Sequence, residues 1–275
     1  MNPLILGDYM RFSNLHTHTT YSDGVGTVRE NIESAISKNM LSLGFSDHSY
    51  TACDTSYCMK LSDYDKYLSE IENMKKEYKD KLPIYTGLEK DYFSDIDRSC
   101  FDYIIASVHY IIRNGICYPI DHSGKQQMDC VADAFGGNVY DMAKCFFDMV
   151  AEQAAKVKPD VIGHFDVINK FSLMPENDDK FINIAMESMK ETVKHCKCFE
   201  INTGAVANGY RKYPYPNKVL LEHLLKLGGE VVIDSDSHKP ANLDFYFKES
   251  VDLLKEVGFN HFCVFNGNGF DKINI

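Results

Sequence analysis

Residues 14–24 read Asn14-Leu15-His16-Thr17-His18-Thr19-Thr20-Tyr21-Ser22-Asp23-Gly24 and follow a short apolar run near the N-terminus. Residues i and i+2 of a β-strand share a face, so His16 and His18 can bind one cation where this strand ends. An H-x-H pair alone is a weak signal, because solvated histidines give the same pattern. Its meaning depends on where the other metal-binding residue types fall in the chain.

Short apolar runs alternate with amphipathic helical patterns along the rest of the chain. The sequence predicts strands over residues 12–15, 41–45, 84–87, 103–106, 160–163, 198–201 and 230–233. It predicts a first helix that begins at the capping box of Thr27 and Glu30. Further helices are predicted over about 62–78, 138–156, 178–195, 216–227 and 243–257. A last apolar run, 262–265, is a candidate to close the sheet. This alternation predicts an α/β fold with a parallel sheet closed, or nearly closed, into a TIM-like barrel.

A single domain is expected to cover residues 1–275, since this length suits one barrel better than two halves. Residues 110–137 are rich in Gly, Asp and Cys and show no clear period. Irregular segments this long are uncommon in compact domains and are often functional. We therefore predict that residues 110–137 form an insertion or lid that faces the substrate.

Composition and charge limit which binding partners and which cellular compartment are expected. The formal net charge is −11 and no Lys/Arg-rich run offsets it, so nucleic acid is not an expected partner. No apolar run approaches the ~20 residues of a spanning helix, and the N-terminus lacks the basic region of a signal peptide. Nine cysteines without a C-x-x-C pair suit free thiols in a reducing compartment. We expect a cytoplasmic protein that binds no membrane, and an anionic substrate would need local positive charge such as metal ions supply.

Metal-binding residue types gather directly after the predicted strands. The carboxyl ends of parallel strands form one rim of a barrel, where active sites lie. Six of the ten histidines follow strand ends, and Asp23 in the first loop can reach the same rim. The other four, His122, His195, His223 and His261, are expected to be surface or packing residues. The nine candidate ligands are His16, His18, Asp23, His48, Glu89, His109, His164, Asp236 and His238.

Nine candidate ligands are more than two ions normally need when water keeps a coordination position. Three ions that share bridging carboxylates fit this number. Six imidazoles favour Zn, Mn or Fe over Ca or Mg, which prefer oxygen donors. The ligand types leave the choice among Zn, Mn and Fe open.

Seven motifs span nearly the whole chain: HTHTTYSDG (16–24), GFSDHS (44–49), TGLEKDY (86–92), SVHY (107–110), GHFD (163–166), EINTG (200–204) and SDSH (235–238). In this order they resemble the polymerase and histidinol phosphatase (PHP) superfamily. The SVH, the YPIDH at 118–122 and the EINTG with a downstream arginine resemble its histidinol-phosphatase branch. The resemblance implies a distorted seven-stranded β/α barrel of the PHP type with three metals on its rim.

The family pattern also implies which residues share an ion. The first group is His16, His18, Glu89 and Asp236. The second is Asp23, His48 and His238, although some relatives have histidine where Asp23 stands. The third is Glu89, His109 and His164, so Glu89 would bridge two ions.

By resemblance the chain would be a phosphatase that converts L-histidinol phosphate to L-histidinol and phosphate in histidine biosynthesis. A metal lowers the pKa of bound water from about 15.7 to about 7. The implied mechanism is therefore in-line attack by a metal-bridging hydroxide, with the ions neutralising charge on the phosphate. The residues expected to hold this hydroxide are His16, His18, Asp23, Glu89 and Asp236.

Two cationic residues are predicted to contact the substrate phosphate. Arg211, ten residues after Ile201, matches a phosphate clamp of the histidinol-phosphatase branch, and its fork suits bidentate binding. Lys170 follows GHFD where relatives present an arginine, and it supplies charge without the fork. The sequence does not choose which aspartate contacts the amine or protonates the leaving oxygen among Asp47, Asp121 and Asp166.

Three alternatives stay open at this point. A PHP phosphoesterase could act on a nucleotide or a phosphotyrosyl protein, and residues 110–137 are where this difference would show. An amidohydrolase also begins with H-x-H, but that family commonly bridges two metals with a modified lysine, where this chain has Glu89. A metal-binding regulatory module would keep the ligands without turnover.

Overall fold

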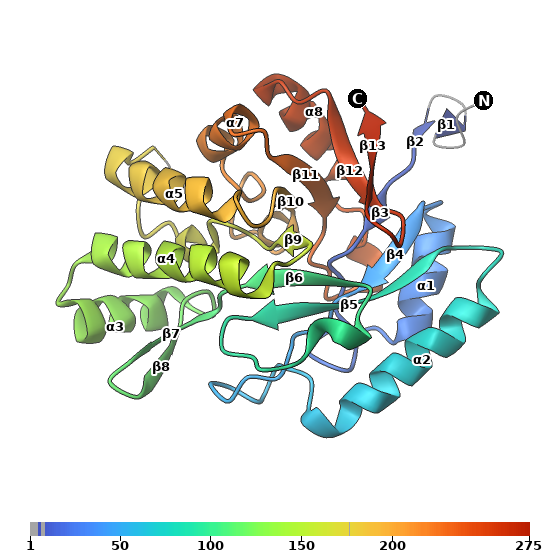
Figure 1. The fold of residues 1–275 in the computed structure, drawn as a ribbon, viewed down its shortest axis with the longest axis horizontal. Coiled ribbons are helices and arrows are strands. Elements are labelled where there is room, and N and C mark those ends of the chain that lie inside the picture. Colours follow the sequence, from blue (N-terminus) through green and yellow to red (C-terminus); the bar gives the residue numbers. More distant parts are fainter. Residues whose placement is uncertain (1–4, 7–8, 176) are drawn as a thin grey trace.

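A computed structural model describes the chain except residues 1–4, 7–8 and 176 (Figure 1). The central sheet has seven parallel strands in the order β11-β10-β9-β6-β5-β4-β3. They are β3 (Ser13–Asn14), β4 (Ser42–Phe45), β5 (Ile84–Asp91), β6 (Tyr103–Ser107), β9 (Val161–Ile162), β10 (Cys198–Asn202) and β11 (Glu230–Asp234). The seven predicted strands and their parallel arrangement are confirmed.

The two edges of this sheet meet at the carboxyl ends of the strands. A parallel bridge joins Thr17, after β3, to Ser237, after β11. The His18 amide donates to the Ser237 carbonyl at 2.9 Å, and the Ser237 amide donates to the His16 carbonyl at 3.1 Å. The sheet is therefore a nearly closed barrel, as the predicted TIM-like fold requires, and its closure places the first and last motifs side by side.

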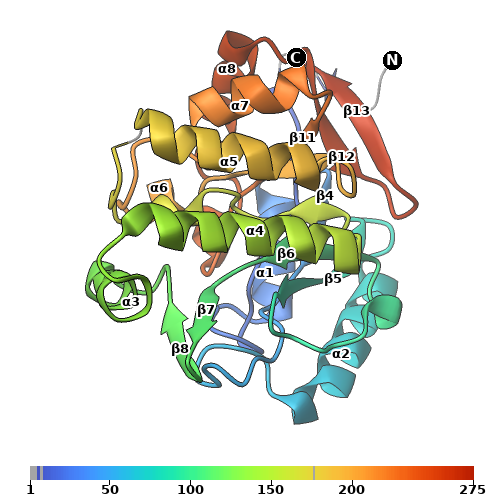
Figure 2. The ribbon, with the colours of Figure 1, turned by 60° about the vertical axis from the view of Figure 1, so that its left-hand side comes forward.

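Helices cover the outside of the barrel, and Figure 2 shows α4 and α5 lying side by side. The helices are α1 (Val28–Ser37), α2 (Tyr64–Glu77), α3 (Gly124–Phe135), α4 (Val139–Val157), α5 (Asp179–Thr192), α6 (Gly204–Ala207), α7 (Lys218–Lys226) and α8 (Phe247–Val257). Of these, α6 lies at the carboxyl rim and α3 packs on α4 and β8. Short 3-10 turns lie at 61–63, 98–100, 167–169 and 240–242. The predicted capping box is present, because the Thr27 side chain accepts from the Glu30 amide and the Glu30 side chain accepts from the Thr27 amide.

Tyr103 fills the barrel interior beneath the carboxyl rim. Its ring crosses β4 and β5 at two glycines, where a Cβ would lie 2.3 Å (Gly44) and 2.2 Å (Gly87) from tyrosine atoms. Its hydroxyl donates to the Phe45 carbonyl at 3.2 Å. The interior is therefore a packed core, and it forms a floor under the groups that follow the strands.

The segment predicted to be irregular, 110–137, is ordered. It contains a hairpin, β7 (Tyr110–Arg113) and β8 (Ile116–Pro119), and then α3. Asn114 and Gly115 form the turn with φ values of 52° and 77°, which is the left-handed backbone that two-residue hairpins need. The Asn-Gly pair between apolar residues was the signal for this hairpin, and the expectation of an irregular loop was wrong.

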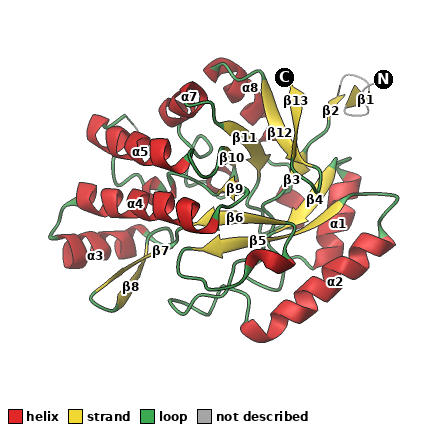
Figure 3. Cartoon of the chain, in the orientation of Figure 1, coloured by secondary structure: helices red, strands yellow, loops and turns green. Residues whose placement is uncertain are grey.

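The apolar run 262–265 does not join the main sheet. It lies in β12 (His261–Phe265), which pairs antiparallel with β13 (Phe270–Asn274) beside the barrel (Figure 3). A further short pair joins β1 (Ile5–Leu6) and β2 (Tyr9–Met10). The sheet closes through residues 17 and 237 instead, so the role expected for 262–265 was wrong.

Cys53 and Cys117 form a disulfide, with Cα atoms 5.6 Å apart. The expectation of free thiols is therefore wrong for this pair, although the other seven cysteines are free. The bond joins the loop after β4 to strand β8. None of the helices in the described part of the chain combines the length and the apolar character that crossing a bilayer requires.

Candidate metal centre

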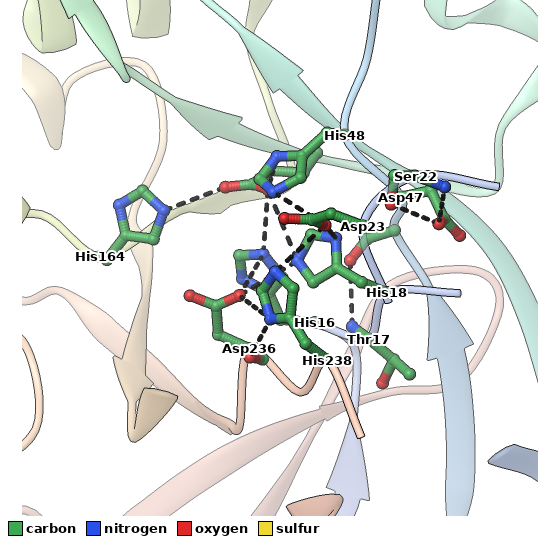
Figure 4. Close-up of polar contacts among 12 residues, drawn as sticks. His16, Thr17, His18, Ser22, Asp23, Asp47, His48, His164, Asp236 and His238 are labelled. Carbon is green, nitrogen blue, oxygen red and sulfur yellow. Dashed lines mark hydrogen bonds and ion pairs between the residues drawn. The ribbon is translucent and has the colours of Figure 1, made fainter. Parts of the chain in front are cut away.

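The nine residues predicted as metal ligands lie together at the carboxyl end of the barrel, and those labelled in Figure 4 point toward a common region. Parallel topology brings together groups that are far apart in sequence, since His18 and Asp236 are 218 positions apart. His16, His18 and Glu89 are buried completely or nearly so. We call these nine residues the candidate metal centre.

Glu89 occupies the middle of this group. One carboxylate oxygen, Oε2, lies 2.6 Å from His48 Nδ1 and 3.3 Å from His16 Nε2. The other, Oε1, lies 3.0 Å from His164 Nε2 and 3.2 Å from His109 Nε2. A carboxylate whose two oxygens face different pairs of imidazoles has the geometry of a bridging ligand.

Two aspartates complete the other side of the centre. Asp23 Oδ1 lies 3.2 Å from His238 Nε2 and 3.7 Å from His48 Nε2. Asp236 Oδ1 lies 3.0 Å from His18 Nε2. Each carboxylate therefore faces imidazole nitrogens from other strands.

Three sets of donor atoms have the spacing of a metal site, with all atoms in a set within 4.8 Å of one another. The sets are His18, Asp23, His48 and His238; His16, His18 and Asp236; and His48, Glu89 and His109. They overlap the three groups that the family pattern implies. Unlike the implied groups, the sets share residues: His18 and His48 each belong to two of them. His164 is in none of the sets and contacts the centre through Glu89.

The centre contains donor atoms that the protein itself does not satisfy. His16 Nε2 and His18 Nδ1 are buried and have no hydrogen-bond partner among the described residues. Leaving such an atom unpaired costs about 1–3 kcal/mol. Imidazole nitrogens and carboxylate oxygens are ligands for divalent transition metals, so these residues fit such ions.

The protonation states of His18 and Glu89 suit a cation, whereas the raised pKa values of His16, His109 and His238 mean that these rings lose protons when they bind one. Burial, followed by repulsion from His238 and His48, lowers the pKa of His18 to about 3, so its imidazole is neutral. Burial opposes ionisation of Glu89, but the nearby His48 and His16 hold the pKa of its carboxyl well below the usual value. A neutral imidazole beside an ionised carboxylate is the protonation state that metal ligation needs.

A cavity of about 320 Å³ opens over the centre. Six of the nine candidate ligands form its floor: Asp23, His48, His109, His164, Asp236 and His238. Its walls include Asp54, Ser56 and Tyr57 from the loop after β4, and Tyr110, Asp121 and His122 from the segment 110–137. The segment predicted to face the substrate thus lines the cavity, and so does His122, which we expected to be a surface or packing residue.

The PHP domain model matches residues 14–204 of the chain. This chain belongs to the PHP family. The match ends before Asp236 and His238, which barrel closure brings into the same centre.

Relatives of this PHP chain are similar over most of their length. Proteins named "Probable histidinol-phosphatase" from Schizosaccharomyces pombe and Deinococcus radiodurans are 26% and 27% identical to it, over 89% and 90% of this chain and 87% and 93% of theirs. A solved structure of histidinol phosphate phosphatase from Lactococcus lactis, complexed with zinc, L-histidinol and phosphate, superposes with a TM-score of 0.72. It is 22% identical and covers 95% of this chain and 99% of that one, which confirms the PHP barrel fold.

Two glycines explain how the loops of this PHP chain reach the centre. A Cβ on Gly24 would lie 2.5 Å from the His18 carbonyl, so the glycine lets the first loop fold back and present Asp23. A Cβ on Gly204 would lie 3.0 Å from Asp236 Cβ. Asp236 has a left-handed backbone, with φ of 48°, which costs a non-glycine residue about 1 kcal/mol or more.

Two orienting carboxylates were missed by the sequence analysis. Glu200 Oε2 lies 2.8 Å from His16 Nδ1, and Asp91 Oδ2 lies 3.2 Å from His109 Nδ1, which leaves the Nε2 atom of each ring for the centre. Burial opposes protonation of His16, but the charges of Glu200, Asp236 and Glu89 together outweigh it and raise the pKa of His16 well above its usual value. Glu200 lies inside a strand, whereas the prediction considered only residues after strand ends, and a buried acidic residue within an apolar strand was the available signal. Asp91 is the last residue of β5, which extends four residues beyond the predicted strand 84–87.

The residues predicted to contact substrate lie in different places. Lys170 lines the cavity, with Nζ 3.6 Å from Asp121 Oδ2. Arg211 is buried over the ring of Tyr215, 4.7 Å from its centre, and is not among the residues that line the cavity. Asp166 does not line it either.

Asp47 supports the first loop. It is fully buried, and its carboxylate accepts from the Thr19 amide at 2.8 Å. It also accepts from the Ser22 hydroxyl at 2.6 Å (Figure 4). Of the three aspartates that the sequence left open, only Asp121 lines the cavity.

Proposed function

We propose that this PHP chain is a metal-dependent phosphomonoesterase that hydrolyses L-histidinol phosphate to L-histidinol and phosphate. The observation that carries the proposal is Glu89, a buried carboxylate whose two oxygens lie within 3.3 Å of four imidazoles beneath the cavity. The names of the relatives, and the ligands of the Lactococcus lactis structure, support the substrate.

The proposed cofactors are three divalent transition-metal ions, Mn, Fe or Zn. Their proposed ligands are His16, His18, Asp23, His48, Glu89, His109, His164, Asp236 and His238. Bound divalent ions lower the pKa of water toward 7 and attract phosphate oxygens. Glu200 and Asp91 hold the rings of His16 and His109 in the orientation that this ligation needs.

Lys170 and Asp121 are proposed to orient the substrate at the cavity wall. The phosphate is anionic and the amino-alcohol part is cationic, so each end matches one member of this ion pair. At 3.6 Å the pair is loose, and both side chains are about one-quarter exposed, so substrate can replace the contact at little cost. Arg211 stays a proposed phosphate contact, which requires its guanidinium to move from the ring of Tyr215.

Aromatic side chains form the wall beside His48. The Tyr57 ring lies 4.8 Å from the His48 ring and 6.2 Å from the Tyr110 ring, and both tyrosines line the cavity. Burial raises the pKa of Tyr57 far above its usual value, so its hydroxyl stays a hydrogen-bond donor. This wall is proposed to pack against the imidazole of the substrate and to exclude water.

A panel of esters tests the substrate. Metal-depleted protein is reconstituted with Mn, Fe or Zn and assayed on L-histidinol phosphate, nucleoside monophosphates, a phosphotyrosyl peptide and an aryl phosphate. We expect kcat/KM to be highest on L-histidinol phosphate by at least about tenfold. A higher value on another ester would overturn the substrate, and bound metal without turnover of any ester would favour the regulatory module.

A cytoplasmic location is also proposed, since amino-acid biosynthesis uses soluble intermediates. The observation against it is the Cys53–Cys117 disulfide, because disulfides are rare in reducing compartments. Fractionation of cells tests the location, with activity expected in the cytosolic fraction.

A further inference from the structure

The amino end of the barrel carries another group of metal-binding residue types. Glu230 begins β11, His261 begins β12, and Cys263 follows on the same face of β12. One donor atom from each lies within 4.8 Å of the others. Glu230 is the first residue of β11 and Asp236 follows its last residue, Asp234, so the length of the strand, about 13 Å, separates this group from the candidate metal centre.

The three donors converge on one carboxylate oxygen. Glu230 Oε2 lies 2.5 Å from His261 Nε2 and 3.7 Å from Cys263 Sγ. The other ring nitrogen of His261 lies 2.6 Å from Asn260 Oδ1, and donating its proton there leaves Nε2 free to bind a cation. An outer partner of this kind commonly orients a histidine ligand.

A cavity of about 390 Å³ opens onto this group. Glu230 and Cys263 line it, and so does Cys198, the register partner of Glu230 in the β10–β11 pair. An ion therefore has a path to the carboxylate and the thiol.

Lys272 does not block this group. Its Nζ lies 2.6 Å from Glu230 Oε1, which is the oxygen that faces away from His261 and Cys263 in these contacts. An ion bound at Oε2 would leave this pair in place. The Lys272 side chain is also 55% exposed and can turn to solvent.

We propose that Glu230, His261 and Cys263 form a second metal site, the amino-end site, for a thiophilic divalent ion such as zinc. Zinc bonds of about 2.0–2.3 Å place tetrahedral ligands about 3.3–3.8 Å apart, which the Glu230–Cys263 separation fits. The His261–Glu230 contact widens by about 1 Å on binding. The thiol releases its proton to solvent when it binds the ion. The ion would link β12 to the main sheet, because β12 does not pair with any strand of that sheet.

Cobalt(II) distinguishes this site from the catalytic one. No cysteine is among the described residues that line the cavity over the candidate metal centre, so a thiolate-to-cobalt absorption band reports on the amino-end site alone. We expect the full-length protein to develop this band to about one equivalent. The band should be lost in Cys263→Ser and kept in the control Cys145→Ser, which changes a half-buried cysteine elsewhere.

His261→Asn is the second variant, because Cys263 is buried and its replacement could impair folding. It should weaken cobalt binding at this site by about 10–100-fold or more, with an unchanged circular dichroism spectrum. The phosphatase activity should stay within about twofold of wild type, so this test is independent of the proposed function. Absence of the band in wild type, or a band unchanged in both variants, would overturn the amino-end site.

Discussion

At the carboxyl end of the barrel, six imidazoles and three carboxylates lie together, and six of these nine groups line a cavity of about 320 Å³. At the amino end, one thiol, one imidazole and one carboxylate lie in or at the start of strands β11 and β12. The donors of the first end sit mostly in the residues and loops that follow strands, whose backbone is free to curve, as in the left-handed turn at Asp236. The donors of the second sit within strands, whose backbone the sheet fixes.

This difference indicates that the carboxyl end serves function and the amino end serves stability. Burying several charges next to one another is unfavourable for folding unless a cation compensates, so the carboxyl end is organised for chemistry. The amino end pairs Glu230 with Lys272 and His261 at the surface, so it holds its charges at little cost. Substitutions at the two ends should therefore have very different effects.

The largest effect is expected at Glu89. Glu89→Gln removes the charge that faces four imidazoles, so metal content and kcat/KM should both fall. The fall in kcat/KM should be about 10³-fold or more, because losing a residue that only orients a metal ligand already costs up to ~10²-fold. Elemental analysis and steady-state kinetics measure the two losses. Glu191→Gln, at an exposed glutamate on α5, is the matched control and should behave as wild type. Full activity in Glu89→Gln would refute the bridging role.

The disulfide is expected to have the next largest effect. It ties together the two segments that line the cavity, one with Tyr57 and one with Tyr110. Cys53→Ser combined with Cys117→Ser should lower the free energy of unfolding by about 2–4 kcal/mol and raise KM more than it lowers kcat. Urea unfolding and kinetics measure these changes, with the exposed Cys100→Ser as control. An unchanged midpoint would show that the cross-link contributes nothing to the carboxyl end.

Glu200→Gln tests the orienting contact beneath the centre. The amide can still accept from His16 Nδ1 but lacks the charge that favours a cation at that ring. Metal affinity or kcat/KM should fall by about 10–100-fold, less than for Glu89→Gln. Added metal should restore part of the activity, because the ligands themselves remain. If excess metal restores nothing, Glu200 acts on folding and not on ligation.

The stability of the metal-depleted protein should depend on pH through His238. Burial opposes its protonation, but the hydrogen bond to Asp23 and the charge of Asp236 raise the pKa of His238 to about 9, above the usual 6.5. The folded state therefore binds this proton more tightly, so the contribution is complete below pH 6.5 and is lost as pH rises through about 9.

Thermal unfolding of metal-depleted protein at several pH values measures this loss, which we expect to be about 1–2 kcal/mol after allowance for solvent screening. His238→Asn should flatten the slope, and the exposed His195→Asn should not. Equal slopes in all three proteins would exclude His238 as the source. Metal binding should show the opposite trend and strengthen with pH, because protons compete for the same nitrogens.

The sequence predicted the carboxyl end better than the rest, for a physical reason. Period-2 and period-3.6 patterns place strands and helices, and parallel topology then puts every residue that follows a strand on one rim, so nine dispersed residues could be assigned to one place. Glu200 and Asp91 escaped because their role depends on which ring lies opposite, and the Cys53–Cys117 pairing depends on how two loops meet across 64 residues. The hairpin at Asn114-Gly115 was predictable from local turn chemistry and was overlooked.

The smallest effect is expected at the amino end, in Lys272→Met. The variant loses the 2.6 Å contact with Glu230, but Lys272 is more than half exposed, so the free energy of unfolding should fall only slightly. Because this pair lies at the other end of β11 from the candidate metal centre, kcat/KM should stay within about twofold of wild type. Cobalt should still bind the amino-end site, since the lysine pairs with the carboxylate oxygen that the ion does not use. A tenfold fall in kcat/KM would mean that the two ends are coupled, and the division between a catalytic and a structural end would then fail.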